Sequence, residues 1–297
     1  MAKKVACPWC GSTKFTHRGA FPRHRYQCKN EKCKRYFQSE YPDVPEIYIL
    51  DIETLPLEVY SWGVYKQRIN PDNVIKDWCL LSYSAKRLFS PKVTGRILTP
   101  AEATKRDDKK LTEEISQILN SADIIIAHNG KSFDIPKINN RLLMHDIRPP
   151  SPYQVIDTKE AAARALGFTS NKLDYIAKKM GLGQKKHTDF DLWVQCSNGN
   201  KEALQYMLEY NKEDVILLED VYVKLRPWIF NHPNLGLYMN LDQTLKTCPN
   251  CNSDDLDLDG TYTTTASVFD SFSCNNCGAR GRNKKSKRTA QLRTISG

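Results

Sequence analysis

The stretch Tyr48–Thr54 constrains this chain more than any other, because it places two carboxylates inside an apolar strand pattern. An apolar run from Ile47 to Leu50 leads into Asp51 and Glu53, which are two residues apart. Side chains alternate along a strand, so both acids would point to the same face of a central strand. A carboxylate buried there needs a positive partner, and Mg²⁺ or Mn²⁺ suits its oxygens. The alternative is that Asp51 ends the strand and caps a turn, and this stretch alone does not decide between the two.

Positive charge is concentrated at the two ends of the 297-residue chain. Residues 1–40 carry a net charge of +8 and residues 279–297 a net charge of +7, whereas residues 41–247 are formally neutral. This pattern favours a polyanionic partner such as a nucleic acid. Simple solubilising tails are the alternative. The length leaves room for one sizeable core with small satellite units.

Eight of the ten cysteines form four close pairs, and their spacing predicts two metal sites. The pairs are Cys7/Cys10, Cys28/Cys33, Cys248/Cys251 and Cys274/Cys277. Two such pairs close a tetrahedral Cys₄ zinc site, so we expect two structural Zn²⁺ ions per chain. Disulfides are the alternative, but the first residues resemble no secretory signal and no stretch approaches the ~18 apolar residues that span a membrane. We therefore expect a cytoplasmic, reducing location without a membrane, in which Cys79 and Cys196 are core thiols.

These patterns divide the chain into five segments. We expect a Cys₄ zinc ribbon at 1–40, a linker at 41–46, an α/β domain at 47–230, a second Cys₄ zinc ribbon at 245–280 and a basic disordered tail at 281–297. In the first ribbon Phe15, Phe21 and Tyr26 alternate with cationic side chains. These aromatics could stack on bases or could form the ribbon's own small core, and the sequence leaves both open.

The middle segment alternates strand and helix patterns. Val74–Leu88 and Val93–Leu98 predict further strands of an antiparallel meander, and the apolar run after Asp123 predicts a buried parallel strand. Apolar spacing predicts helices at 111–119, after Asp134, and at about 158–166, 171–180 and 200–226, with a loop at Lys105–Lys110.

Three further residues in this segment carry chemistry. Asp134 opens a helix at the carboxyl end of the strand at 122–127, where ligands gather in α/β sheets, although a plain helix N-cap is the alternative. Tyr210 and Asp214 lie four residues apart on one helix face. A basic loop could lie along a nucleic-acid backbone, or could simply join two helices; it contains Lys185, Lys186 and His187.

Together, three separated pieces resemble one enzyme family. They are Asp51-Ile-Glu53, His128-Asn129-x₃-Phe133-Asp134 and Tyr210-x₃-Asp214. Their order, spacing and context resemble the three motifs of the DEDD superfamily of 3′–5′ exonucleases, over about 47–226. The resemblance is to the proofreading exonuclease domains of family B DNA polymerases and to stand-alone phage or bacterial relatives. Glu209 stands where the histidine branch of the family has its base, so Tyr210 indicates the tyrosine branch. The two flanking zinc units depart from the family pattern.

The resemblance implies an α/β, ribonuclease H-like fold, with a mixed sheet flanked by helices. It also implies 3′–5′ hydrolysis of the phosphodiester bonds of DNA, the expected partner, with two metal ions. Four acids would hold the two Mg²⁺ or Mn²⁺ ions, namely Asp51, Glu53, Asp134 and Asp214. Tyr210 would orient the attacking water. Asn129 and Phe133 would position the terminal nucleotide or the turn that carries Asp134.

Other functions fit the same residues. An RNA exonuclease or a structure-selective endonuclease could use the same acids, and a DNA-binding adaptor could carry a retired site. The presence of all four acids and the tyrosine counts against the adaptor. A replication or repair complex could recruit the enzyme, which we expect to be a monomer.

Overall fold

The structure is a computed structural model that describes residues 6–7, 9–17, 25–34, 36–38, 44–184, 186, 188–238, 246–258 and 260–293. The chain divides into two compact units. Glu46–Tyr222 forms one unit, called the central unit below, and the two ends of the chain form the other. The finer division into five segments stays a prediction. Among the described residues, no helix has both the length and the apolar character that crossing a membrane requires.

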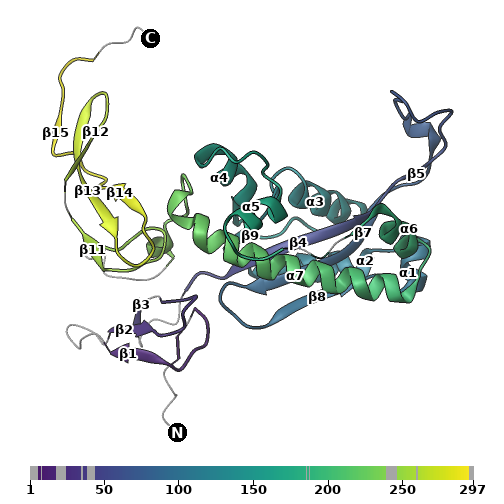
Figure 1. The fold of residues 1–297 in the computed structure, drawn as a ribbon, viewed down its shortest axis with the longest axis horizontal. Helices are drawn as coiled ribbons and strands as arrows, with labels where there is room; N and C mark the ends of the chain where they lie inside the picture. Colours follow the sequence, from purple (N-terminus) through teal and green to yellow (C-terminus); the bar gives the residue numbers. More distant parts are fainter. Residues whose placement is uncertain are drawn as a thin grey trace. The chain divides into compact units, whose positions relative to one another are not determined.

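A mixed sheet of five strands lies at the centre of the central unit (Figure 1). Its order is β10-β9-β4-β7-β8, in which the strands are β4 (Ile47–Leu55), β7 (Cys79–Arg87), β8 (Val93–Ile97), β9 (Ile124–Ala127) and β10 (Gln154–Asp157). β4, β7 and β8 are antiparallel, whereas β9 runs parallel to β4 and to β10. The predicted meander and the predicted buried parallel strand are both confirmed, because every residue of β9 is buried.

One predicted strand is divided in the structure. Val74–Lys76 (β6) pairs with Glu58–Val59 (β5) as a separate two-stranded ribbon, and β7 begins only at Cys79. The side chains of β6 are exposed or half-buried, whereas those of β7 are almost all buried. The prediction of one strand over Val74–Leu88 was therefore wrong, because only its second part faces the core.

Seven α-helices occur in the described part of the chain. They are α1 (Pro100–Lys105), α2 (Lys109–Ser121), α3 (Asp134–Met144), α4 (Thr158–Ala165), α5 (Leu173–Lys179), α6 (Phe190–Ser197) and α7 (Lys201–Leu225). Single 3₁₀ turns cover Pro71–Asn73, Arg226–Trp228 and Leu235–Leu237. The sequence analysis missed α6, whose start is capped by Asp189 accepting from the N–H of Leu192. It also took Lys105–Lys110 for a loop, although α1 ends and α2 begins within it.

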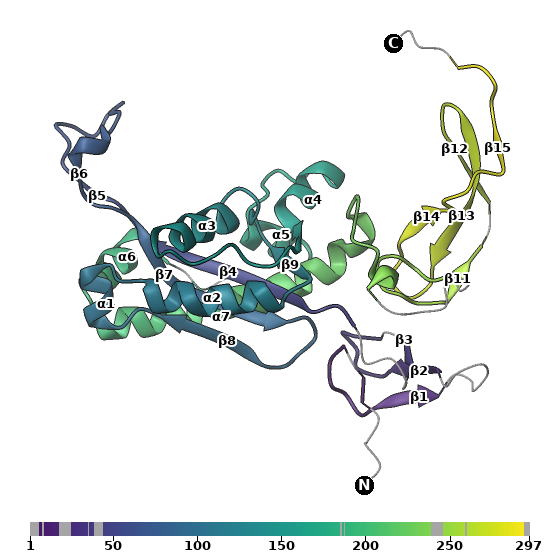
Figure 2. The ribbon, with the colours of Figure 1, turned by 180° about the vertical axis from the view of Figure 1, so that it is seen from behind.

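Helices cover both faces of this sheet (Figures 1 and 2). Neighbouring residues of a strand point to opposite faces. The hydroxyl of Ser82 donates to Asn211 Oδ1 of α7 at 3.2 Å, and the hydroxyl of the next residue, Tyr83, donates to Glu114 Oε2 of α2 at 2.8 Å. α7 and α2 therefore lie on opposite faces of β7.

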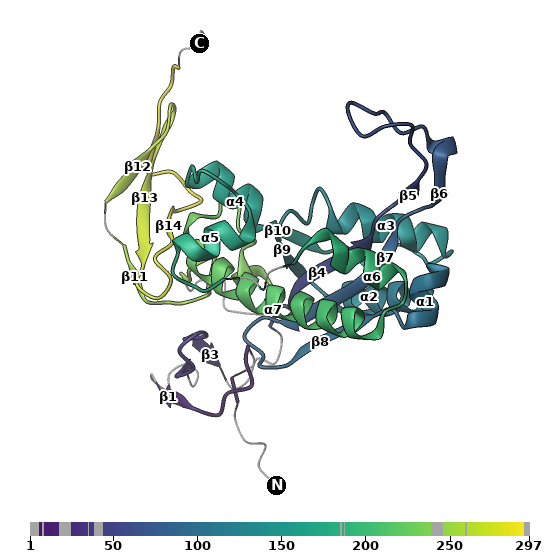
Figure 3. The same ribbon diagram turned by 45° about the vertical axis from the view of Figure 1, so that its right-hand side comes forward.

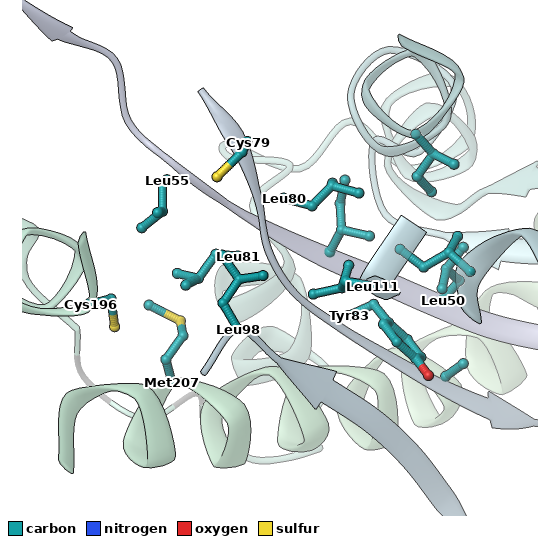
Figure 4. Packing of buried hydrophobic residues seen from close by; sticks show 14 of the residues in the cluster. Leu50, Leu55, Cys79, Leu80, Leu81, Tyr83, Leu98, Leu111, Cys196 and Met207 are labelled. Atoms are coloured by element: carbon teal, nitrogen blue, oxygen red, sulfur yellow. The ribbon is translucent and has the colours of Figure 1, made fainter. Parts of the chain in front are cut away.

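The main core gathers Leu, Ile and other apolar side chains from the sheet and its helices (Figure 4). Leu81 and Leu111 are fully buried, and Met207 of α7 joins the same cluster. Burying a side chain of this size contributes roughly 1.5–3 kcal/mol each. Cys79 and Cys196 also belong to the cluster, as predicted, and burial raises the pKa of each thiol to about 12.

The two ends of the chain each contain a small sheet of short strands. The N-terminal one is β1-β2-β3, with β1 (Phe15–His17), β2 (Arg25–Cys28) and β3 (Tyr36–Gln38). The rings of Phe15 and Tyr26 pack edge to face with centroids 4.9 Å apart. This contact favours the interpretation that these aromatics form the ribbon's own core. Phe21 lies outside the described residues.

The C-terminal sheet is built around one long strand. The long strand is β13 (Ser267–Cys274). The other four strands pair with it and are β11 (Leu256–Asp257), β12 (Thr261–Thr263), β14 (Arg280–Arg282) and β15 (Arg288–Thr289). Lys287 also forms an ion pair with Asp270 at 2.7 Å. The prediction of a disordered tail over 281–297 was therefore wrong for β14 and β15, because β13 offers backbone partners and an acid to this basic segment. Residues 294–297 lie outside the described residues.

A buried ion pair fastens α7 to the sheet. Lys86 Nζ of β7 lies 2.7 Å from both carboxylate oxygens of Glu219, and both side chains are almost fully buried. Glu219 also accepts from the N–H of Phe89, which has a left-handed backbone with φ +66°. Each charge is thus satisfied by a group on the other element or on the adjoining turn, which sets how α7 lies against β7.

We expect Glu219→Gln to lower the free energy of unfolding by about 3–5 kcal/mol, because it leaves the Lys86 ammonium buried without its counter-charge. Denaturant unfolding of purified protein measures the change. The double variant Lys86→Met/Glu219→Met should recover most of the loss. Glu160→Gln is the matched control, since it breaks the exposed Lys131–Glu160 pair and should cost less than ~1 kcal/mol. Equal losses in the two single variants would contradict the assigned role.

Candidate active site

β4 presents Asp51 and Glu53 on the face that α7 covers. They lie opposite Ser84 and Ser82 of β7, and Ser82 bonds to α7. The register of the two strands shifts between Glu53 and Thr54, which marks a β-bulge. Bulges re-aim side chains beside functional sites. The two carboxylates predicted to share a face therefore do so, at an irregular point of the sheet.

α7 brings a third carboxylate to the same place. Asp214 is buried, and one carboxylate oxygen each of Asp51, Glu53 and Asp214 lies within 4.8 Å of the others. Like charges this close repel one another, and burial strengthens the repulsion. A hard divalent cation relieves it, and an all-carboxylate donor set fits Mg²⁺ or Mn²⁺. The group thus fits a metal ion, as the sequence predicted for these three residues.

Asn211 also belongs to this group, although the sequence analysis missed it. Its Nδ2 donates to Asp51 Oδ2 at 2.6 Å, its Oδ1 accepts from Ser82, and the side chain is fully buried. It therefore fixes the orientation of the Asp51 carboxylate within the group. The available signal was its position three residues before Asp214, which puts both on one helix face.

Asp134 lies outside this carboxylate group. It is buried at the first residue of α3, and its Oδ1 accepts from the N–H of Ile52, between Asp51 and Glu53 in the chain, at 3.2 Å. β9 runs beside β4 only along Ile47–Ile49, so Asp134 takes up a backbone group beyond that pairing. Its predicted place at the start of a helix holds, and its role as a metal ligand stays a prediction.

A buried salt bridge holds the other end of α3. Arg141 donates from Nε to Asp108 Oδ2 and from a terminal nitrogen to Oδ1, each at 2.7 Å. Asp108 Oδ2 also accepts from the N–H of Leu80 in β7. α3 is therefore fixed to the sheet at both ends, which fixes the position of Asp134.

The turn between β9 and α3 is shaped by Asp157, a residue that the sequence analysis left without a role. Its carboxylate accepts from the N–H groups of Asn129 and Lys131 at 3.0 and 3.1 Å, and it also caps α4. Gly130 completes the turn, since a Cβ there would lie 2.4 Å from Ala127 Cβ. The signal for Asp157 was an N-cap acid with Glu160 three residues later.

A pocket of about 380 Å³ opens beside the carboxylates. It is lined by Asp51, His128, Asn129, Lys159, Asn171, Lys172, Leu173, Asp174 and Tyr210. His128 Nε2 donates to the carbonyl of Asn171 at 2.8 Å, and Nδ1 lies 2.9 Å from the Thr158 hydroxyl, so the ring is held in one orientation. Tyr210 thus lines a polar pocket that Asp51 also borders.

The predicted substrate-binding residues divide into four cases. Asn129 lines the pocket, with a left-handed backbone at φ +72° and its Oδ1 accepting from Lys159 Nζ. Phe133 is 37% exposed and is not among the residues that line the pocket. Lys186 forms an ion pair with Glu213 of α7 at 2.8 Å. Lys185 and His187 lie outside the described residues.

Each predicted cysteine set forms a compact cluster. The four sulfurs of Cys7, Cys10, Cys28 and Cys33 lie within 4.8 Å of one another, as do those of Cys248, Cys251, Cys274 and Cys277. Two sulfur pairs in each cluster are separated by 3.6–3.8 Å. A tetrahedral site with Zn–S bonds of about 2.3 Å requires roughly 3.8 Å between sulfurs. Both clusters therefore fit a metal ion.

Turn geometry supports this fit. The N–H of Gly11, which follows the second cysteine of the first pair, donates to the carbonyl of Cys7 at 2.8 Å, with φ +71° at Gly11. The N–H of Gly278 donates to the carbonyl of Cys274 in the same way, with φ +76°. Hydrogen bonds from Cys33 and Cys7 lower the pKa of Cys10 to about 2, whereas the hydrogen bond with Cys10 raises the pKa of Cys7 to about 12, so the thiols of this cluster share their protons unequally.

Comparison with known proteins gives one family match. Residues 90–226 match the family model described as RNase_H superfamily. This range contains Asp134, Tyr210 and Asp214 but begins after Asp51 and Glu53. No curated protein matches the chain.

Among solved structures, the chain is similar to the family B DNA polymerase from the hyperthermophilic archaeon Pyrobaculum calidifontis, with a TM-score of 0.44 and 11% sequence identity. The alignment covers 62% of this chain and spans 25% of the length of the polymerase chain.

The mixed five-stranded sheet with helices on both faces agrees with the family match. The central unit of this chain therefore has a ribonuclease H-like fold.

Proposed function

We propose that this protein is a metal-dependent 3′–5′ exonuclease that hydrolyses phosphodiester bonds of DNA. One observation carries the proposal: three carboxylates from β4 and α7 gather together, and one of them, Asp51, lines a pocket that Tyr210 also lines. Holding three like charges this close together, with Asp214 buried, is costly, and such groups cluster at functional sites. The ribonuclease H-like fold supports a nuclease, and the resemblance of the three motifs supports the 3′–5′ direction and the tyrosine branch.

The donors proposed for the metal site are Asp51, Glu53 and Asp214, with Asp134 beside them. Two divalent ions held there would supply positive charge at the scissile phosphate and favour hydroxide over water at neutral pH. Asn211 would keep Asp51 in its orientation through the 2.6 Å hydrogen bond. The Tyr210 hydroxyl would hold the attacking water in line.

The pocket supports the binding of a single terminal nucleotide. Its volume of about 380 Å³ is at the lower end of small-molecule sites. Lys159 and Lys172 could meet phosphate oxygens, whereas Asn129 and Asp174 offer groups for a sugar hydroxyl. A site that holds one free end would release nucleoside monophosphates one at a time.

End-labelled substrates test this proposal. Single- and double-stranded DNA and RNA, each labelled at the 5′ end, are incubated with Mg²⁺ or Mn²⁺. A ladder that shortens from the 3′ end of DNA is expected. Preference for RNA, or internal cuts in a blocked or circular strand, would favour the RNA exonuclease or the endonuclease. Binding of nucleic acid without cleavage, with either Mg²⁺ or Mn²⁺ present, would favour the non-catalytic DNA-binding adaptor.

We also propose that each Cys₄ cluster holds a structural Zn²⁺ ion. Protein purified without added metal should contain two zinc ions per chain by elemental analysis. Eight thiols should react with a thiol reagent only after zinc is removed, because metal-bound thiolates are protected. Cys79 and Cys196 provide the internal control, since they should stay unreactive until the central unit unfolds. Zinc-free protein with eight freely reactive thiols would reject both sites.

Tyr210→Phe should lower the rate of cleavage by ~10-fold to ~100-fold, because a misplaced nucleophile is costly, while Mg²⁺ affinity and unfolding temperature stay unchanged. Asp214→Asn should weaken Mg²⁺ binding as well as turnover. Steady-state rates over a Mg²⁺ titration separate the two effects. Tyr206→Phe is the matched control, one turn earlier on α7 and partly exposed, and should cleave at the wild-type rate. A wild-type rate in Tyr210→Phe would show that this ring only packs.

The buried carboxyl group of Asp134, a proposed metal ligand, should make the free energy of unfolding depend on pH. Burial raises its pKa from 3.8 to about 7, while the N–H of Ile52 opposes the shift. The folded protein therefore holds this proton more tightly than the unfolded chain, so without Mg²⁺ the free energy of unfolding should fall as pH rises from about 4 to about 7.

Asp134→Asn keeps an acceptor for Ile52 and removes the titration. In buffer freed of divalent ions, its stability relative to wild type should rise by roughly 2 kcal/mol between pH 5 and pH 8. Chemical denaturation at a series of pH values measures this. The exposed Asp72→Asn is the control and should show no such trend. A pH-independent difference for Asp134→Asn would contradict the raised pKa.

A further inference from the structure

The β5–β6 ribbon projects from the body of the central unit (Figure 3). The segment that joins its two strands is rich in exposed aromatic residues. Trp62 is fully exposed, and Tyr60 and Tyr65 are each 76% exposed. Large aromatics seldom stand alone in water, because their burial stabilises a fold more than that of almost any other side chain. Three at the tip of one projecting ribbon therefore indicate a binding surface.

Hydrogen bonds and ion pairs hold the base of the ribbon, so the point from which the tip projects is fixed. Arg106 donates to the carbonyls of Pro56 and Asp77 at 2.7 and 2.8 Å and to Glu58 at 2.7 Å. Lys76 pairs with the same carboxylate at 3.0 Å across the two strands. Pro56 and Asp77 flank the two ends of the ribbon, so one guanidinium closes it at its root.

The charge of the tip selects the kind of partner. Residues 59–71 contain Lys66 and Arg68 and no acid. Lys66 Nζ lies 5.3 Å from the Tyr65 ring centroid, so cation and ring are presented together. Aromatics interleaved with cations suit a single-stranded nucleic acid, in which bases stack on rings while phosphates meet the cations.

A similar set of side chains lies between this ribbon and the candidate active site. Phe133, next to Asp134, is partly exposed, and Lys137 Nζ lies 6.0 Å from its ring centroid. The same nitrogen lies 3.6 Å from the ring centroid of Trp78, which follows β6 at the base of the ribbon. A run of rings and cations thus leads from Asp134 to the root of the ribbon.

We propose that the β5–β6 ribbon binds the single-stranded segment of the nucleic-acid substrate that adjoins the candidate site, by stacking bases on Tyr60, Trp62 and Tyr65. This assignment rests on the proposed nuclease function for the identity of its ligand. It gives the enzyme a grip on several nucleotides beyond the one in the pocket, within the central unit itself.

Binding of a labelled oligothymidylate of about 20 nucleotides tests the proposal in buffer without Mg²⁺, where no cleavage is needed. The variant Tyr60→Ser/Trp62→Ser/Tyr65→Ser should bind at least ~10-fold more weakly than wild type. Phe190→Ser, which removes an exposed aromatic from the start of α6, is the matched control and should bind as wild type does. Unfolding temperatures of both variants should equal that of wild type, since the rings that are removed are exposed.

A second probe separates stacking from charge. An abasic strand of equal length has the phosphates but no bases, so wild type and the triple aromatic variant should bind it equally. Lys66→Gln/Arg68→Gln should instead reduce the slope of log K against log salt by ~0.7 for each phosphate that the variant no longer binds. Undiminished oligothymidylate binding by the triple variant would overturn the proposal and leave the exposed rings to a protein partner. An equal weakening on the abasic strand would also overturn it.

These outcomes are independent of the nuclease assay. Aromatic-dependent binding together with no cleavage in Mg²⁺ or Mn²⁺ would reject the proposed function and keep the ribbon as a nucleic-acid site. Cleavage together with undiminished oligothymidylate binding by the triple aromatic variant would support the proposed function and reject the ribbon as a nucleic-acid site.

Discussion

Repulsion among three carboxylates is the constraint on which the central unit depends. Asp51, Glu53 and Asp214 have oxygens within 4.8 Å of one another, and Asp214 is buried. Without a cation such a group favours separation of the two elements that carry it, β4 and α7. The neighbouring contacts are arranged against that separation. Asn211 binds Asp51 and Ser82 together, and further along the helix Lys86 and Glu219 join α7 to β7 through a buried ion pair.

This arrangement explains why one face of the sheet is polar although it is covered by a helix. Ser82, Ser84 and Lys86 alternate along β7, and each is buried. Apolar side chains in their place would pack against α7 at a lower cost in free energy, because no polar group would be buried. They would not hold a carboxylate group in one geometry. The apolar core includes Leu81, Leu111 and Tyr83, and Met207 of α7 belongs to the same cluster. α7 therefore contributes both to the apolar core and to the polar candidate site.

The two ends of the chain depend on a different source of stability. Their strands are mostly two to four residues long and bury few apolar side chains, so a hydrophobic core alone supplies little stability. Each has four sulfurs at distances that suit a tetrahedral metal ion, together with turns that direct backbone N–H groups toward cysteine carbonyls. Metal binding and folding are coupled in units of this kind, which makes zinc content a measure of their integrity.

Several features of this protein follow from its sequence alone, because they depend on local periodicity and spacing. Period-two alternation places Asp51 and Glu53 on one face wherever the strand lies. A four-residue separation places Tyr210 and Asp214 on one side of a helix. The spacing of paired cysteines determines the two sulfur clusters, since each pair closes within one short turn.

Other features depend on contacts between segments far apart in the chain, and only the tertiary structure reveals them. Asn211 is an ordinary helical residue until β4 and β7 lie beside it, 160 and 129 residues earlier in sequence. Asp157 resembles any helix cap until β10 places it against the turn at Asn129. The basic segment that contains Arg288–Thr289 resembles a disordered tail in sequence, but β13 offers these two residues backbone partners. In each case the side chain or backbone group has several possible partners, and the packed arrangement of the strands and helices selects one of them.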